Sequence, residues 1–243
     1  MKAVILAAGM ASRLRPLTDH SPKCLLRIGS KCLLQRTLEA LIENGIEDVI
    51  IVTGYLKEKI EAFIGEHFPK LKVVYVCNER YQSTNNIYSL WLVKQFVWNE
   101  DILLLDSDIL FESGVISTIL AAPYPDCLAL NVHELGDEEI KVIAGQDNRI
   151  VEISKTCSAK KAIGESIGIE KLSNRFVRSL FYELDVMINE QNLSNVFYEA
   201  AFENLIRKGA ALYAVDTSSC FSMELDTVAD FQNACDRIPL KMC

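Results

Sequence analysis

A short loop near the N-terminus carries the residue types that bind phosphate. The apolar run 3–8 breaks at Gly9, and the polar stretch after it leads to Arg13 and to Pro22-Lys23. Small residues let backbone N–H groups approach phosphate oxygens, while arginine and lysine supply charge. Neither the Walker sequence G-K-[ST] nor the dinucleotide fingerprint G-x-G-x-x-G is present. The predicted phosphate-binding residues are Leu6, Ala7, Ala8, Gly9, Met10, Ala11, Ser12, Arg13 and Lys23. The alternative is an ordinary strand-to-helix turn with solvated basic residues.

Two carboxylates follow a second apolar run, Leu103-Leu104-Leu105. Alternation along a strand puts Asp106 and Asp108 on one face if the strand geometry persists. Open parallel sheets bind ligands at the carboxyl ends of their strands, and Mg²⁺ prefers carboxylates together with phosphate oxygens. The pair therefore predicts a metal or nucleotide site, with a solvated Asp-x-Asp turn as the alternative.

The pattern L-A-A-G-x-x-x-R-L followed by P-K resembles the signature of the nucleotidyltransferases that activate sugar phosphates and small alcohol phosphates. The family usually has glycine where this chain has Ala11 and proline where it has Cys32. The resemblance implies that Asp108 binds Mg²⁺, that Asp106 supports it, and that Asp226 completes the metal site. Thr227 and Asp230 form a capping-box pattern, which leaves the Asp226 side chain free.

The segment 78–91 contains Asn85-Asn86-Ile87-Tyr88-Ser89-Leu90. This stretch is similar to a CTP-using subgroup of the family, related to the bacterial phosphocholine cytidylyltransferases. An amide can pair with a base edge through both its donor and its acceptor. The predicted nucleotide-binding set therefore also includes Asn78, Asn85, Asn86, Ser89 and Asp106. Helix capping above a core stripe of Tyr88, Trp91 and Trp98 is an equally weighted alternative for the two asparagines and Ser89.

Four residues of the back half are predicted to bind the acceptor: Lys155, Glu165, Tyr198 and Glu199. Lys155 would bind the acceptor phosphate, and Tyr198 and Glu199 would meet a cationic head group by ring face and by charge. The alternative for Lys155 is a solvated lysine at the end of a strand. The alternative for Tyr198 and Glu199 is the first turn of a helix, where glutamate suits the helix dipole. The segment 134–139 is acidic rather than aromatic, which leaves room for a primary amine such as aminoethylphosphonate in place of choline.

The reaction implied by the resemblance is transfer of a nucleotide to a phosphate or phosphonate oxygen, with release of pyrophosphate. A phosphate ester has its second pKa at about 6, so the attacking oxygen is already anionic. No general base is needed, and no histidine is expected beside these motifs. Arg13, Lys23 and Lys155 are the predicted catalytic residues, with Mg²⁺ as cofactor. The alternatives are an aminoethylphosphonate cytidylyltransferase, a sugar-1-phosphate nucleotidyltransferase and, more remotely, a noncatalytic nucleotide-binding module.

The elements that must position these residues alternate strand and helix. Strands are expected at 2–8, 48–53, 72–76 and 101–105, with helices at 33–44, 56–67 and 86–98 between them. The order predicts an α/β fold, with a Rossmann-like, mixed and mostly parallel sheet flanked by helices. Further strands at 126–132, 140–144, 149–153, 166–171 and 211–216 and helices at 174–190, 197–207 and from 227 complete a single nucleotidyltransferase domain over 1–243. Residues 1–125 form its nucleotide-binding half and 126–243 its acceptor-binding half.

Composition narrows the classes of partner. The net charge of −8 and the sequence pI of about 5.0 argue against nucleic acid as a partner. The eight cysteines form no C-x-x-C pair, and scattered thiols fit a reducing cytoplasm. No apolar run reaches the ~20 residues of a membrane span. The expected partners are a nucleoside triphosphate, CTP above all, and a small phosphorylated or phosphonate acceptor.

Overall fold

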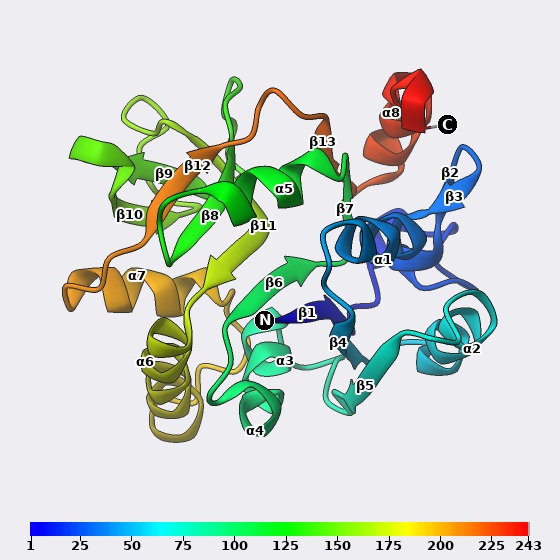
Figure 1. Cartoon of the computed structure of the whole chain (residues 1–243), viewed down its shortest axis with the longest axis horizontal. Coiled ribbons are helices and arrows are strands. Elements are labelled where there is room, and N and C mark those ends of the chain that lie inside the picture. The colour runs from blue at the N-terminus through cyan, green and yellow to red at the C-terminus, as the bar shows by residue number, and fades with distance from the viewer. Residues whose placement is uncertain (243) are drawn as a thin grey trace.

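A mixed sheet of nine strands forms the centre of the protein, and the computed structural model describes residues 1–242 (Figure 1). Four neighbouring strands are parallel: β6 (Ile102–Asp106), β1 (Lys2–Ala7), β4 (Asp48–Thr53) and β5 (Lys72–Cys77). Their apolar residues alternate between the two faces of the sheet. Val4 and Leu6 of β1 belong to one buried cluster, and Ala3 and Ile5 belong to the other.

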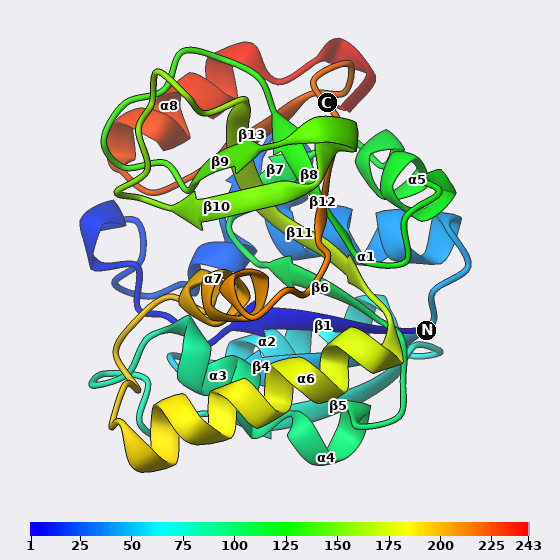
Figure 2. The ribbon, with the colours of Figure 1, turned by 90° about the vertical axis from the view of Figure 1, so that its left-hand side faces the viewer.

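The remaining strands extend the sheet from β6 in mostly antiparallel fashion (Figure 2). These are β11 (Gly164–Leu172), β8 (Cys127–Asn131), β9 (Lys141–Ala144), β10 (Ile150–Ser154) and β12 (Tyr213–Asp216). The long strand β11 pairs with β6, β8 and β9, so it connects the front half of the chain to the back half. The predicted mixed, mostly parallel α/β fold is confirmed.

Helices cover both faces of the sheet. One apolar cluster lies under α1 (Leu33–Glu43), α2 (Lys57–His67) and α5 (Gly114–Ala121). The other lies under α3 (Asn86–Leu92), α4 (Lys94–Val97), α6 (Asn174–Asp185) and α7 (Glu199–Arg207). The predicted helix 86–98 is thus two helices, because the hydrogen bonds at Val93 switch to residues three positions apart. The predicted helix 174–190 continues from α6 as a π-helical turn, Val186–Glu190.

Two small strand pairs were not expected from the sequence, whereas the terminal helix predicted from residue 227 is present. β2 (Arg27–Ile28) pairs with β3 (Lys31–Cys32), and β7 (Ile109–Phe111) pairs with β13 (Ser222–Glu224). After β13 the helix α8 (Val228–Arg237) begins with the predicted capping box. The β7–β13 pair returns the C-terminal part of the chain to the end of β6, next to the candidate site.

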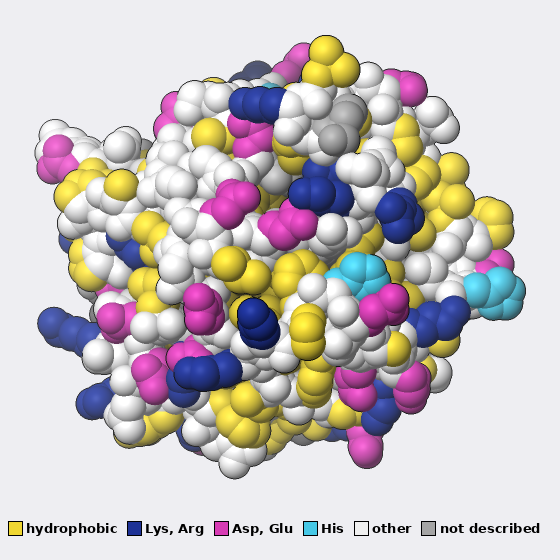
Figure 3. All heavy atoms as spheres, turned by 45° about the vertical axis from the view of Figure 1, so that its right-hand side comes forward, with side chains coloured by type: hydrophobic (Ala, Val, Ile, Leu, Met, Phe, Trp, Pro, Cys, Tyr) yellow, Lys and Arg dark blue, Asp and Glu magenta, His cyan; other side chains and the backbone are white. Residues whose placement is uncertain are grey.

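The surface of the molecule is mixed in charge. On the face shown in Figure 3, Lys and Arg side chains stand among Asp and Glu side chains rather than in one basic patch. Within residues 1–242, no helix has both the length and the apolar character needed to cross a membrane.

Candidate active site

A cavity of about 400 Å³ opens at the carboxyl ends of β1 and β6. It is lined by residues from both halves of the chain. The predicted site residues that line it are Leu6, Ala7, Ala8, Gly9, Met10, Ala11, Ser12, Arg13, Lys23, Asn78, Asn85, Asn86, Ser89, Asp106, Asp108, Lys155, Glu199 and Asp226. Glu165 and Tyr198 are the two predicted site residues that do not line it.

The loop after β1 reaches the cavity through a tight backbone turn. Ala11 adopts a left-handed conformation (φ 46°, ψ 52°), and its carbonyl accepts from Leu14 N (3.0 Å) and from Thr18 Oγ1 (3.0 Å). Left-handed backbone favours glycine because it has no Cβ. The family's usual glycine at the position of Ala11 therefore has a conformational reason.

Lys23 lies between two carboxylates at one end of the cavity. A 3-10 turn, Lys23–Leu25, follows Pro22 and presents the lysine side chain, which is only 10% exposed. Its Nζ lies 3.0 Å from Asp108 Oδ2 and 2.8 Å from Asp226 Oδ1. Burial alone would lower the pKa of Lys23, but the two carboxylates outweigh it and raise the pKa to about 12. Lys23 is therefore a fixed positive charge.

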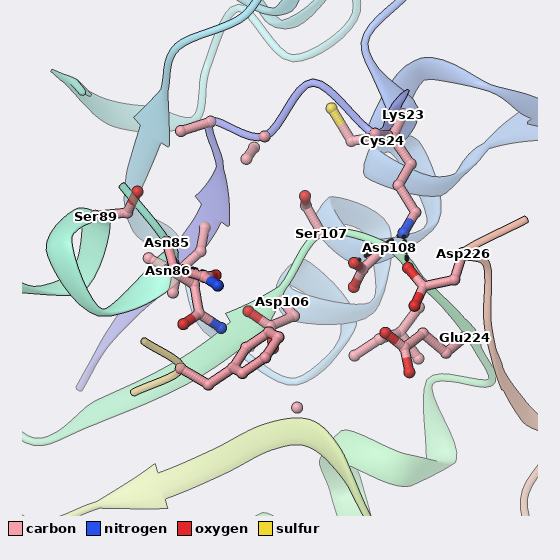
Figure 4. A pocket seen from close by; sticks show the side chains of 18 of the residues that line it. Lys23, Cys24, Asn85, Asn86, Ser89, Asp106, Ser107, Asp108, Glu224 and Asp226 are labelled. Carbon is pink, nitrogen blue, oxygen red and sulfur yellow. Dashed lines mark hydrogen bonds and ion pairs between the residues drawn. The ribbon is translucent and has the colours of Figure 1, made fainter. Parts of the chain in front are cut away.

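The β7–β13 pair explains how Asp226 comes to lie beside Asp108. Glu224 is opposite Ile109 in the pair, and Leu225 N donates to the Asp108 carbonyl (3.0 Å). Thr227 and Asp230 cap α8, so the Asp226 carboxylate points into the cavity instead (Figure 4). Burial raises the pKa of Asp226, but Lys23 and Arg13 outweigh burial and lower it. Arg13 Nη2 lies 2.5 Å from Asp226 Oδ2.

Three carboxylates form a group suited to a hard divalent cation. One oxygen from each of Asp108, Glu224 and Asp226 lies within 4.8 Å of the other two. Oxygen-only ligands of this kind fit Mg²⁺. Burial, followed by the charges of Asp108 and Asp226, raises the pKa of Glu224 to about 8. Glu224 was not predicted as a ligand from the sequence, although its spacing to Asp226 repeats the Asp106-x-Asp108 spacing.

Asp106 has different neighbours from Asp108. The strand ends at Asp106, so the expected strand alternation does not continue to Asp108. The Tyr198 hydroxyl donates toward Asp106 Oδ2 (3.1 Å) and toward the buried Glu170 Oε1 (3.2 Å). Burial, and next the charge of Asp108, raises the pKa of Asp106 well above its usual range. Glu170, which the sequence analysis missed, belongs to this buried acidic group under the cavity.

The predicted role of the Tyr198 ring is wrong. Tyr198 is fully buried, and its ring packs at 68° against Phe202 in the core. Its neighbour Phe197 lines the cavity instead and is 41% exposed. Successive residues entering a helix point in different directions, so only one of the two rings can face the cavity. Lys155 Nζ lies over the Phe197 ring, 4.7 Å from its centre.

Glu165 also lies outside the cavity wall. Its Oε2 is 2.7 Å from His133 Nε2, on the loop between β8 and β9. This contact contradicts the expectation that no histidine lies beside the motifs. The reason is the pairing of β11 with β8, which brings Glu165 opposite Asn131, two residues before His133.

The asparagines of the α3 segment have distinct environments. Asn78 is buried, and its Nδ2 donates to Ser89 Oγ (3.0 Å) and Thr84 Oγ1 (3.2 Å). Asn85 Oδ1 accepts from Asn86 N (2.7 Å), and Asn86 Oδ1 accepts from Tyr198 N (3.0 Å). The amide oxygens of Asn85 and Asn86 are thus occupied, and their NH₂ groups have no acceptor within residues 1–242. Figure 4 shows both residues across Asp106 from the carboxylate group.

The back half of the chain, residues 126–243, contributes a lysine and a buried glutamate to the cavity. Lys155 Nζ lies 3.4 Å from Glu138 Oε2, and the same Glu138 oxygen is 3.7 Å from Arg13 Nη1. Burial raises the pKa of Glu199 to about 7, against the opposing effects of its backbone hydrogen bond and of Lys155. Cations and anions therefore alternate along the cavity wall.

The family model, the two relatives and the solved structure described below are all nucleotidyltransferases. A family model described as nucleotidyl transferase matches residues 2–123. A choline-phosphate cytidylyltransferase of Streptococcus pneumoniae is 29% identical over 96% of each chain. A CTP:phosphoglutamine cytidylyltransferase of Campylobacter jejuni is 26% identical over 96% of this chain and 98% of its own. Among solved structures, the CTP:phosphocholine cytidylyltransferase from Streptococcus pneumoniae superposes with a TM-score of 0.81 at 26% identity, covering 98% of this chain and 99% of that one.

Proposed function

This chain belongs to the nucleotidyl transferase family, and from that premise we propose that it is a cytidylyltransferase. It would join CMP from CTP to a small phosphorylated alcohol or phosphonate and release pyrophosphate. A choline-phosphate cytidylyltransferase and a CTP:phosphoglutamine cytidylyltransferase each match 96% of this chain, and the acceptors in their names carry phosphate. The observation that carries the proposal is the convergence of Arg13 and Lys23 with two carboxylates at one end of the cavity.

The donor end would stabilise charge rather than move protons. An acceptor phosphate is already anionic at neutral pH, so it can attack the α-phosphorus without a base. Lys23 stays protonated because its pKa is raised to about 12, and Arg13 can bind phosphate with paired N–H groups. Both would align the triphosphate and neutralise the charge that grows on the leaving pyrophosphate. Lys155 would hold the attacking phosphate.

The amide groups beside α3 support cytosine as the base. The oxygens of Asn85 and Asn86 accept backbone N–H groups, which leaves their NH₂ donors for a ligand. Cytosine offers two neighbouring acceptors, O2 and N3, whereas uracil carries a hydrogen on N3. Donors aimed at N3 would therefore favour CTP over UTP, because a donor facing a donor leaves both unpaired. Asn78 would act indirectly, by fixing Ser89.

Mg²⁺ is the proposed cofactor. Asp108, Asp226 and the newly identified Glu224 would hold it, since their oxygens already lie within 4.8 Å of one another. When bound, a divalent cation offsets negative charge on the triphosphate. Arg13 and Lys23 also contact Asp226, so the same carboxylate orients the two basic side chains.

We further propose that residues 1–243 act as a single domain. The supporting feature is that β11 pairs directly with β6, and that residues of both halves line the same cavity. Lys155 and Glu199 come from the back half, and the phosphate loop comes from the front.

A pyrophosphate-release panel tests the proposed function. CTP, UTP, dTTP and ATP are each combined with phosphocholine, phosphoethanolamine, 2-aminoethylphosphonate and glucose 1-phosphate, with Mg²⁺ or with EDTA. We expect turnover with CTP and at least one small phosphate or phosphonate, and only with the metal. A preference for UTP or dTTP with the sugar phosphate would instead assign the chain to the sugar-1-phosphate branch.

A further inference from the structure

Two polar atoms in the cavity wall are buried without a hydrogen-bond partner among residues 1–242. They are Oε2 of Glu199 and Oγ of Ser166. Both side chains are almost fully excluded from solvent, with exposed fractions of 5% for Glu199 and 6% for Ser166. Buried polar groups in folded proteins are nearly always paired, so two such atoms in one cavity wall indicate a ligand that would pair them.

Both atoms belong to the acceptor half of the cavity. Ser166 lies on β11, and its backbone N donates to the Ile140 carbonyl (2.9 Å). Glu199 begins α7 and follows Phe197 by two residues. Lys155 lies over that phenylalanine ring, and its charge acts on Glu199. The unpaired atoms therefore share this end of the cavity with the lysine proposed to bind the acceptor phosphate.

Glu199 Oε2 needs a donor of N–H or O–H groups, and the Ser166 hydroxyl oxygen can accept from the same donor. An ionised carboxylate only accepts, and it favours a cation that brings its own hydrogens. A quaternary ammonium has none and is bound by aromatic faces instead. Of the aromatic residues lining this cavity, Tyr81 packs beside Tyr55 on the donor side, and Phe197 already has Lys155 over its ring.

Resting on the proposed function, we propose that the acceptor is a short zwitterion whose primary ammonium group donates to Glu199 Oε2 and Ser166 Oγ. Its phosphate or phosphonate would lie at Lys155, and its carbon chain would pass along Ile140 and Ile167, which line the same cavity. The ammonium would also stabilise the charged form of Glu199, whose pKa burial raises to about 7. Glu199 and Ser166 are then the residues that set acceptor specificity.

Matched acceptors test this assignment. Phosphoethanolamine and 2-aminoethylphosphonate carry the primary ammonium on a phosphate and on a phosphonate. Phosphocholine has no N–H group, and ethyl phosphate has no amine. For the wild-type protein we expect kcat/KM about 10- to 100-fold higher with a primary amine than with phosphocholine or ethyl phosphate, since a site built for donors rejects ligands that lack them.

The variants Glu199→Gln and Ser166→Ala should lower kcat/KM for the primary amine about tenfold or more while changing that for ethyl phosphate less than threefold. Glu203→Gln, one turn further along α7 and outside the cavity, is the control. Calorimetric titration with phosphoethanolamine and ethyl phosphate gives the same comparison without turnover. Equal losses with every acceptor, or a loss confined to the KM for CTP, would overturn the assignment. Absence of any CTP-dependent pyrophosphate release alongside selective binding of phosphoethanolamine would overturn the proposed function alone.

Discussion

Lys23 Nζ lies 2.8 Å from Asp226 Oδ1, although 203 positions separate the two residues in the chain. The same nitrogen lies 3.0 Å from Asp108 Oδ2. One buried cation thus holds two carboxylates that come from different elements, and its removal would leave two like charges side by side. The balance of charge at this end of the cavity therefore depends on Lys23.

Replacing Lys23 with alanine should remove most of the activity. Loss of one preorganised charge on a developing anion costs about 10²- to 10³-fold in kcat. Steady-state pyrophosphate release at saturating CTP and acceptor measures the effect. Lys31→Ala is the matched control, because Lys31 pairs with Glu39 (2.6 Å) outside the cavity. Near wild-type turnover of the Lys23 variant would contradict its assignment.

Metal binding should be visible without turnover. Mg²⁺ at 100 times its dissociation constant stabilises a protein by about 2.7 kcal/mol if only the folded state binds it. We expect Mg²⁺ to raise the Tm of the wild-type protein, and the rise to vanish in the double variant Asp108→Asn/Asp226→Asn. Asp147→Asn, in the β9–β10 turn, should keep the full rise. EDTA should abolish turnover, and a metal-independent rate would exclude the carboxylate group as a required metal site.

The parts of the site that follow a long buried strand could be predicted from the residues themselves, whereas Asp226 was predicted only through the family resemblance. The loop after β1 and the Asp106–Asp108 turn are anchored by uninterrupted apolar runs, so their place at the sheet edge follows from the strand order. Asp226 reaches that edge through β7 and β13, which are three residues each and too short to show a period. Whether the Phe197 ring or the Tyr198 ring faces the cavity depends on the direction in which α7 enters the core, and no local sequence pattern predicts that direction.

Glu138 should act as a competitor for the acceptor. Its Oε2 lies 3.4 Å from Lys155 Nζ and 3.7 Å from Arg13 Nη1. Glu138 therefore occupies the place in which a bound phosphate would contact these two cations. The side chain is 77% exposed, and an exposed ion pair contributes at most about 1 kcal/mol. Glu138→Gln should therefore lower the KM for the acceptor about two- to fivefold and leave kcat nearly unchanged. Glu134→Gln on the same loop is the control, and a raised KM would instead make Glu138 part of the binding surface.

Gly168 should not tolerate a side chain. Its φ is +70°, and an added Cβ would lie 2.6 Å from Asp106 Oδ2. Gly168→Ala must strain the backbone or displace Asp106 from the Tyr198 hydroxyl, so we expect a loss of about 2 kcal/mol or more in unfolding free energy together with a reduced kcat. Chemical denaturation and initial rates measure the two effects. Gly65→Ala, where α2 offers open space, should instead stabilise by roughly 0.5–1 kcal/mol. Equal stability of the two variants would show that the close approach at Gly168 does not constrain Asp106.

Glu199 should make the stability of the protein depend on pH between about 5 and 8. Its pKa is about 7 in the folded protein against 4.5 as the ordinary value, because burial disfavours the charge. Between pH 4.5 and pH 7 the folded state keeps a proton on Glu199 that the unfolded state has released. The stabilisation of the folded state by this proton is therefore full below pH 4.5 and is lost as the pH rises through 7. Glu199→Gln cannot ionise, and its stability relative to wild type should rise by about 2–3 kcal/mol from pH 5 to pH 8. Denaturant titrations at both pH values measure the change, with the exposed Glu66→Gln as control. A relative stability that stays constant over this range would mean that Glu199 ionises near its ordinary pKa.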